Sequence, residues 1–244
     1  MTSFGVYQYQ ASGLLVAALL LFSTSMQADE PQPFSVTYKV YRSGFEVGTT
    51  RYKLMRDAEF YIYDAKARPA GIAVVLGLDK AMEITRLQQQ NGQLRPMQYE
   101  YSIEGEDQSR RQISFDWEQM VATVIKPDKT RTIRLTPDTL TPLAMQLVVM
   151  QDMQVGQLKP SYTVIGNKRL EHYRVRKLGT EPVVTGIGRL QTVLIEGSHT
   201  RKGVTRTMRL WCAPDLAYLP VKVEQDRDES SFTLELVAVE GLGK

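Results

Sequence analysis

The sequence predicts a mainly β protein: an antiparallel, curled or barrel-like sheet of about a dozen strands with one helix. Apolar and polar residues alternate with a period of two in many short segments, which is typical of half-buried strands. Turn sequences such as Asn91-Gly92 and Pro127-Asp128 separate neighbouring segments, as in hairpins between antiparallel strands. Only residues 142–153 have clear helical spacing, and no segment repeats at a solenoid or propeller period. We therefore expect a sheet that curls around its own core.

The composition fits a single globular domain. The chain has 244 residues, of which 43% are hydrophobic and 23% are charged. We expect residues 29–244 to form one β-rich domain, since about 215 residues can bury a sufficient core. The net charge of +3 is mild and gives no indication of a nucleic-acid partner. Cys212 is the only cysteine, so no disulfide can form within the chain, and its strand position indicates a small core residue.

The N-terminus has the pattern of an export signal. Residues 1–27 contain no charged side chain, and Gly13–Phe22 is an unbroken apolar run. This run is too short to cross a hydrocarbon core of about 30 Å, but it suits a signal peptide. We expect residues 1–28 to be a signal peptide cleaved after Ser25 or Ala28, giving a periplasmic protein with no transmembrane span. The alternative is a buried or membrane-anchoring N-terminal helix, since the signal lacks Lys or Arg before its apolar run.

The first half of the mature chain consists of predicted strands. Alternation predicts strands at 34–40, 45–55, 60–68, 82–89, 94–103, 113–117, 120–125 and 130–135. Gly48, inside the second of these, indicates a bulge or a close backbone approach. Residues 70–78 are apolar and fit either a short helix or a buried strand, and residues 105–109 are expected to form a polar loop.

One amphipathic helix is predicted at 142–153, packed against the sheet. Thr141 is a suitable N-cap, Pro142 suits the first helical position, and Gly156 follows the end. An apolar face is formed by residues at i, i+4 and i+7: Leu143, Leu147 and Met150. Two interpretations of the helical methionines remain, core filling or a ligand surface: Met145, Met150 and Met153.

The second half returns to strands, at 161–165, 171–178, 190–200 and 231–239, with a hairpin at 205–226. In that hairpin Pro214-Asp215 has turn chemistry, and Pro220 opens the return strand. Trp211 alternates out of phase with its apolar neighbours Met208, Leu210 and Cys212. If those three face the core, its indole lies on the other side of the sheet, where it is either covered or largely exposed. Pro214, Tyr218 and Pro220 are the expected cover, with a ligand as the alternative.

Several motifs together resemble a known family. They are FSVTYKVYRSGFEVG at 34–48, Phe115-Asp116-Trp117, the Thr141-Pro142 helix start, and LWCAPDLAYLPVKVE at 210–224. From about Phe34 to Leu242 the chain is similar to the bacterial envelope family called domain of unknown function 3108. It departs from the family pattern in the helix, where Gln151-Asp152 comes late and no Asp-Pro opens the helix. The resemblance implies a secreted or periplasmic, mostly antiparallel β protein with no established catalytic residues.

We assign no catalytic, metal-binding or cofactor-binding residue from the sequence. The two histidines, His172 and His199, lack the spacing of a zinc site, and nucleophile elbows and phosphate loops are absent from the sequence. The acidic residues of the 104–107 segment are expected on a surface loop. Asp116 is expected to anchor a turn or to pair with an arginine.

Two groups of residues stand out as candidates. The first is a structural or ligand cluster: Trp211, Pro214, Asp215, Tyr218, Pro220, Asp116 and Trp117. The second is a set of basic segments, at 168–169, 174–177 and 201–209, which we interpret as solvated sheet face with a preference for anionic lipid or glycan.

Three functional hypotheses follow. The first is a non-catalytic binding module for an apolar or amphiphilic, lipid-like ligand, with the helix as plug or lid. Its concave face would be rich in aromatic residues: Tyr38, Tyr61, Tyr63, Tyr99, Tyr101 and Phe115. The second is a structural or accessory envelope protein that acts through a protein partner, and the third is a hydrolytic enzyme. An apolar cavity would favour the first, and a filled interior with an exposed apolar patch the second.

Overall fold

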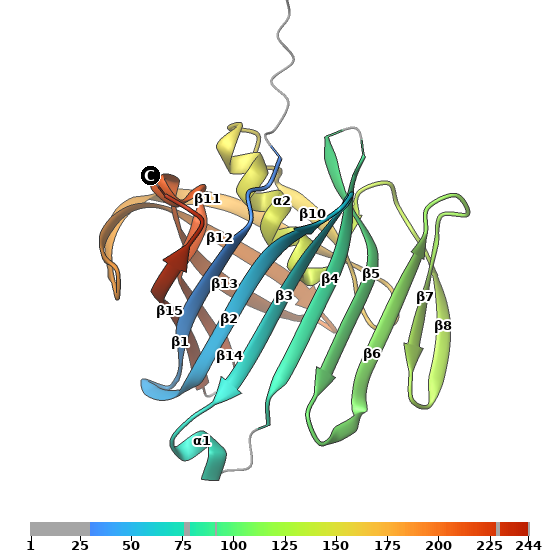
Figure 1. Ribbon diagram of the computed structural model, residues 1–244, viewed down its shortest axis with the longest axis horizontal. Helices are drawn as coiled ribbons and strands as arrows, with labels where there is room; N and C mark the ends of the chain where they lie inside the picture. The colour runs from blue at the N-terminus through green and yellow to red at the C-terminus, as the bar shows by residue number, and fades with distance from the viewer. Residues whose placement is uncertain (1–29, 76–78, 91, 228–229, 244) are drawn as a thin grey trace, which may run out of the picture.

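A computed structural model describes residues 30–75, 79–90, 92–227 and 230–243. It contains one sheet of fifteen strands in the order β8-β7-β6-β5-β4-β3-β2-β1-β15-β14-β13-β12-β11-β10-β9 (Figure 1). The strands are β1 (Phe34–Arg42), β2 (Phe45–Asp57), β3 (Phe60–Pro69), β4 (Ala81–Gln90), β5 (Gln93–Ile103), β6 (Glu106–Asp116), β7 (Val121–Lys126), β8 (Lys129–Arg134), β9 (Thr139–Leu140), β10 (Ser161–Ile165), β11 (Leu170–Thr185), β12 (Gly188–Arg201), β13 (Val204–Ala213), β14 (Leu219–Arg227) and β15 (Ser230–Glu240). The predicted mainly β, antiparallel class is confirmed, with the short pair β9–β10 parallel.

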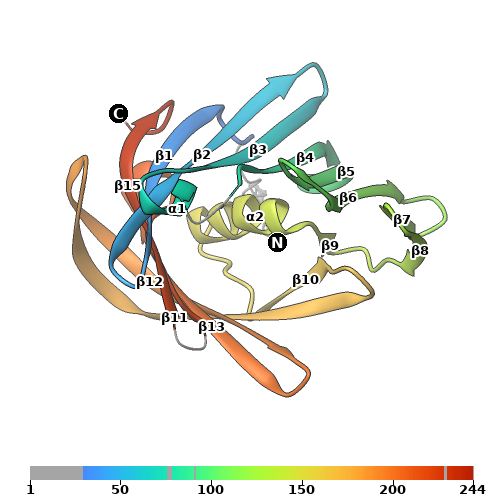
Figure 2. The same cartoon turned by 90° about the horizontal axis from the view of Figure 1, so that it is seen from below.

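The sheet curls into a barrel-like shape without closing (Figure 2). Its two edge strands are β8 and β9, and the ends of β7 and β8 face the turn that joins β10 to β11. We call this unclosed line between β6–β8 and the β10–β11 turn the seam. It is the place where the curled sheet lacks a continuous hydrogen-bond ladder.

The sequence underestimates the number and length of the strands. β6 starts at Glu106, so the residues expected to form a polar loop are already strand, and Gly105 makes the turn with φ +81°. β11 continues to Thr185, beyond the predicted end at 178. In both places the extra strand residues are mostly exposed. Their sequence therefore lacks the alternation of apolar and polar residues that marks a half-buried strand.

The prediction for Gly48 is confirmed. The register between β1 and β2 shifts beside it, and a Cβ at Gly48 would lie 2.3 Å from the carbonyl oxygen of Arg68. Its φ of +150° also disfavours other residues. Of the ambiguous segment 70–78, Ile72–Val75 form the one-turn helix α1, and residues 76–78 lie outside the described residues.

The predicted helix is confirmed as α2 (Pro142–Gln154), which lies inside the curl of the sheet (Figure 2). Its burial is wider than one amphipathic face, because only Pro142 and Gln154 are exposed. Strands surround the helix, so residues away from the predicted face are buried as well. The helix therefore fills the interior of the sheet as a plug.

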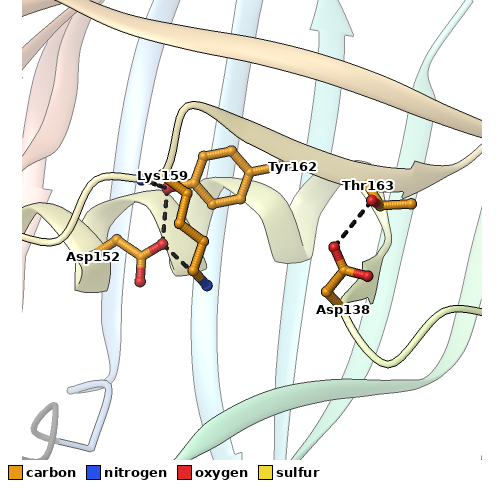
Figure 3. Close-up of polar contacts among 5 residues, drawn as sticks. All are labelled: Asp138, Asp152, Lys159, Tyr162 and Thr163. Carbon is orange, nitrogen blue, oxygen red and sulfur yellow. Dashed lines mark hydrogen bonds and ion pairs between the residues drawn. The ribbon is translucent and has the colours of Figure 1, made fainter.

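Side chains of the sheet hold both ends of α2. At its start, the Thr141 hydroxyl accepts a hydrogen bond from the Ala144 amide (3.1 Å) and lies 2.7 Å from the hydroxyl of Thr85 on β4. At its end, Tyr162 of β10 donates to Asp152 (2.8 Å), and Lys159 lies 3.5 Å from the same carboxylate oxygen (Figure 3). These contacts fix the plug to opposite walls of the curl.

Two hydrophobic clusters make up the core. The larger one surrounds α2 and contains three of the predicted concave aromatic residues, all fully buried: Tyr38, Tyr61 and Tyr63. The smaller cluster lies at the seam and draws side chains from both of its sides: Tyr99, Ile113, Phe115, Ala122, Val124, Ile133, Leu135 and Ile165, with Leu170 packed against it. We call it the seam cluster. Within the described residues, neither helix is long and apolar enough to cross a membrane.

Candidate functional site

The most distinctive surface feature is an open cleft of about 420 Å³ at the seam. We call it the basic cleft. It is lined by residues from β6–β8, from the β10–β11 turn and from the end of β12: Gln108, Val124, Lys126, Asp128, Lys129, Arg131, Asn167, Lys168 and Arg201. Five cationic side chains therefore share the lining with a single carboxylate. A concave surface dominated by one charge sign focuses its electric field and attracts ions of the opposite sign.

The sheet topology explains why these cations gather. β7 and β8 form a hairpin at one edge of the sheet, and the inward positions near its tip are Lys126, Lys129 and Arg131. Curling brings the opposite part of the sheet, with Lys168 and Arg201, to the other side of the same cleft. Residues from distant parts of the chain thus meet across the seam.

The cations of the cleft are not neutralised by ion pairs. In the part of the chain that the structure describes, none of the five forms an ion pair, whereas seven other lysines and arginines do. Uncompensated positive charge in a concavity is unfavourable by itself and is relieved by an anion. The arrangement is therefore suited to bind an anionic group.

One apolar residue lies among the lining residues of the cleft. Val124 lines the cleft and is also a member of the seam cluster, where it is 1% exposed. Beside it, Arg111 donates to Asn167 across the seam and to the hydroxyl of Tyr99 at 2.6 Å. The cleft thus combines five cationic lining residues with one apolar lining residue, and a polar clasp lies beside it at the seam.

A buried polar group lies behind this clasp. Glu83 of β4 is near Tyr99 and Arg111, and one of its carboxylate oxygens has no hydrogen-bond partner. Burial raises the pKa of Glu83, although a hydrogen bond with Tyr99 and the charge of Arg111 oppose the shift. Burial also raises the pKa of Tyr52, with the Glu83 charge adding to the effect, to about 12. The interior around Glu83 therefore disfavours negative charge, in contrast to the cleft.

Trp211, at the centre of the sequence-predicted cluster, is 7% exposed. Its indole N–H donates to the carboxylate of Glu181, and Lys222 lies 4.9 Å from the ring centroid. Glu181 belongs to the distal part of the β11–β12 hairpin, which curls along the outer side of the sheet, away from α2 (Figure 2). We call residues 178–191 the arm.

The arm contributes much of the cover over Trp211. The amide of Gly186 at its tip donates to the carbonyl of Leu236 on β15 (2.9 Å), three strands beyond β12 in the sheet. A Cβ at Gly186 would lie 3.0 Å from the Cα of Val237, so this contact is close. Val183 and Leu190 of the arm pack on the larger hydrophobic cluster together with Trp211.

The other residues of the predicted cluster lie in two separate parts of the structure. Pro214 and Asp215 are exposed in the short 3-10 turn η1 (Pro214–Leu216), and Tyr218 follows it with φ +59°. Pro220 is buried, and its carbonyl accepts from the hydroxyl of Tyr38 at 2.7 Å. This is a corner that joins β13, β14 and β1.

Asp116 and Trp117 lie at the β6–β7 turn. Asp116 is exposed and accepts from the amide of Gln119 at 2.9 Å, as expected for a turn anchor. Trp117 packs against the seam cluster, stacks on Phe115 and donates to the carbonyl of Pro96. Trp211, in contrast, belongs to the larger cluster, so the structure does not unite the seven residues in one site.

The histidines and the cysteine, which could take part in catalysis or metal binding, are not among the lining residues of the basic cleft. His199 stacks on Tyr173 at 4.6 Å and lies 3.4 Å from Glu171, and His172 lies 3.4 Å from the Thr163 hydroxyl. The described residues hold no group of three potential metal ligands. Burial raises the pKa of the Cys212 thiol to about 12, so it is not a reactive thiolate at neutral pH. A second cleft, of about 310 Å³ at the β5–β6 turn, includes Glu104, Glu106 and Asp107, all exposed.

The sequence contained part of the signal for the basic cleft. Residues 168 and 201 belong to the basic segments of the sequence, whereas Lys126, Lys129 and Arg131 lie outside them. The alternation of basic residues along the β7–β8 hairpin was the available clue. This alternation indicates a cleft only when the curl of the sheet is known, because the curl brings the hairpin to the β10–β11 turn.

These features define a class of protein: an open, curled β-sheet plugged by a helix, with a basic cleft at its seam. The chain matches the family model described as protein of unknown function (DUF3108) over residues 34–237, and it belongs to that family. The sequence-based resemblance to this family is thus confirmed.

Comparison with solved structures extends the description of the fold. The structure is similar to a beta-barrel-like protein of domain of unknown function DUF1849 from Brucella abortus, with a TM-score of 0.58 and 12% identity. That similarity covers 86% of this chain and 97% of the other. A protein with a YmcC-like fold from Bacteroides fragilis gives a TM-score of 0.34 at 12% identity, covering 85% of this chain and 95% of the other. No curated protein matches the sequence.

Proposed function

We propose that this protein is an exported, non-catalytic binding module of the bacterial cell envelope that binds its ligand through an anionic group in the basic cleft. The observation that carries the proposal is the set of five unpaired cationic side chains around one concavity. Phosphate is the anion we favour, because Arg and Lys provide several hydrogen-bond donors for its oxygens. Of the lipid-like ligands that the sequence suggested, this favours amphiphiles with an anionic head group.

A purely apolar ligand receives less support. The space inside the curl is occupied by α2 and the larger hydrophobic cluster, and the four interior tyrosines that were candidates for ligand contact are buried by protein: Tyr38, Tyr61, Tyr63 and Tyr99. The two clefts described above are lined mainly by polar and charged residues. The interior is thus a protein core, and ligand binding is proposed at the seam.

The proposal is tested with butyl phosphate, a soluble ligand with a short chain, by isothermal titration calorimetry. A variant with Lys126→Gln, Arg131→Gln and Lys168→Gln removes three charges from the cleft. We expect binding by the wild type and a loss of about 10- to 100-fold in affinity in the variant, from three weakened charge-assisted contacts. Butyltrimethylammonium, which carries the opposite charge, should not bind.

A matched control variant distinguishes the effect of the cleft charges on binding from the effect of the total charge. Arg174→Gln, Lys177→Gln and Arg209→Gln remove three exposed charges from other strands, with the same change in total charge. This control variant should bind butyl phosphate like the wild type. Equal losses in the two variants would mean that the cleft is not a site, and absence of binding by the wild type would contradict the proposed function.

Export is proposed from the sequence, since residues 1–28 lie outside the described residues. The apolar run of residues 13–22 should be removed on secretion. N-terminal sequencing of protein from the envelope fraction should then start after Ser25 or Ala28. An intact Met1 on protein in the cytoplasmic fraction would refute export.

A second candidate function is that of an accessory protein that acts through a protein partner. It is favoured by the arm, whose tip exposes Val184 (76%) and Ile187 (37%) on the outer side of the sheet. Exposed apolar residues that lie close together on a surface hairpin can form part of a protein contact. A photo-crosslinking residue at position 184 should then capture one defined envelope protein, and the same residue at the exposed position 132 should not.

A further inference from the structure

We propose that the seam opens to admit the apolar chain of the ligand, so that the seam cluster is the chain-binding site and the basic cleft holds the head group. This inference rests on the proposed function and adds the ligand class: a single molecule with an anionic head and an alkyl chain. Three structural observations carry it.

The first is that the seam is weakly held. Between β6–β8 and β10–β13, one side-chain hydrogen bond is found among the described residues, from Arg111 to Asn167. Every neighbouring strand pair elsewhere in the sheet is joined by a backbone ladder. Further along the chain after β8, Asp138 also accepts a hydrogen bond from Thr163 of β10 at 3.0 Å. Parting the seam beside the cleft therefore breaks the Arg111–Asn167 hydrogen bond and apolar contacts, and needs no break in the sheet pairing.

The second is that the seam cluster is separate from the core around α2 and is shared between the two sides. Ile165 and Leu170 come from the β10–β11 side, and the facing residues come from β5–β8 and the chain that follows. Leu170 is only half buried. An alkyl chain could take up the contacts that Ile165 and Leu170 make within the seam cluster, so opening exposes no new apolar surface to water.

The third is that the cleft and the seam cluster are continuous. Val124 is at once a lining residue of the cleft and a buried member of the cluster. Asn167, which accepts the hydrogen bond from Arg111, also lines the cleft. An anion that engages Lys168, next to Asn167, would thus lie directly beside the point where the seam opens.

A series of monoalkyl phosphates, from butyl to decyl and kept below their micelle concentrations, tests the inference by calorimetry. Each added methylene that enters the cluster should tighten binding about fourfold. Leu170→Ser should remove most of this dependence on chain length, so that decyl phosphate binds little more tightly than butyl phosphate. Leu178→Ser, which changes an exposed leucine of the arm, should leave the dependence intact.

A distance measurement keeps the test decisive if Leu170→Ser folds poorly. Spin labels at Thr132 on β8 and Arg169 in the β10–β11 turn, both exposed, report the width of the seam in a Cys212→Ala background. Octyl phosphate should lengthen the distance between the labels, and butyl phosphate should not.

The outcomes separate the two proposals. Affinity that does not depend on chain length, or an unchanged label distance with octyl phosphate bound, would overturn the seam-opening inference and leave the head-group site in place. Failure of every alkyl phosphate to bind would contradict the proposed function itself.

Discussion

Replacing Trp211 by alanine tests whether the arm and the outer face of the sheet form a true second layer of core. The indole is 7% exposed, and it packs in the larger cluster beneath Glu181 of the arm and beside Lys222. Deleting a buried tryptophan costs about 3–5 kcal/mol of unfolding free energy. For a domain of this size each kcal/mol corresponds to roughly 2–4 °C, so the melting temperature should fall by about 6–20 °C.

Trp211→Phe separates packing from hydrogen bonding. Phenylalanine keeps most of the apolar contact and loses the indole N–H bond to Glu181, which is itself exposed and can turn to water. We therefore expect a loss of only about 1 kcal/mol. Urea and thermal unfolding should show a much larger loss of unfolding free energy for Trp211→Ala than for Trp211→Phe.

Fluorescence gives a direct readout of the same packing. The chain has two tryptophans, so Trp117→Phe leaves Trp211 as the only one. Its emission should be blue-shifted and poorly quenched by acrylamide. A melting shift of only one or two degrees in Trp211→Ala, together with free quenching, would refute the reasoning that the arm buries this residue.

Three further predictions concern the plug, the bulge and the buried carboxyl. Thr141→Val removes the N-cap of α2 and leaves the buried hydroxyl of Thr85 without its partner, so urea unfolding should show a loss of about 1–3 kcal/mol. Gly48→Ala should cost more than about 2 kcal/mol, because its Cβ would overlap a backbone carbonyl of β3, and thermal unfolding should show the loss. Burial raises the folded-state pKa of Glu83, so its ionised form lowers stability as the pH rises through that value. Glu83→Gln should be more stable than the wild type at pH 7, by up to about 1 kcal/mol, and the difference should disappear near pH 4 in unfolding titrations; a difference that grows on acidification would contradict this assignment.

The sequence was most informative where one local rule determines the structure. Thr141 and Pro142 defined the start of α2, and Gly48 marked a close approach that only glycine allows. The strand pattern gave the antiparallel class because side chains on one face of most strands are buried. In each case the physical cause lies within a few residues of the signal.

The features that the sequence did not reveal depend on contacts between distant segments. The cover over Trp211 includes Glu181, thirty residues earlier, and no local pattern places the arm on the outer side of the sheet. The basic cleft joins the β7–β8 hairpin to the β10–β11 turn through the curl of fifteen strands. Small twists between neighbouring strands add up to this curl, so it cannot be read from any single segment.

The central claim is that the basic cleft holds the anionic group of an envelope ligand, and native mass spectrometry of protein purified from the envelope tests it most directly. The wild type, and the control variant with Arg174, Lys177 and Arg209 changed to glutamine, should retain a bound anionic amphiphile. The cleft variant with Lys126, Arg131 and Lys168 changed to glutamine should be recovered without it. Equal occupancy in the cleft variant and the control variant, or a wild type that carries only uncharged lipid, would contradict the account.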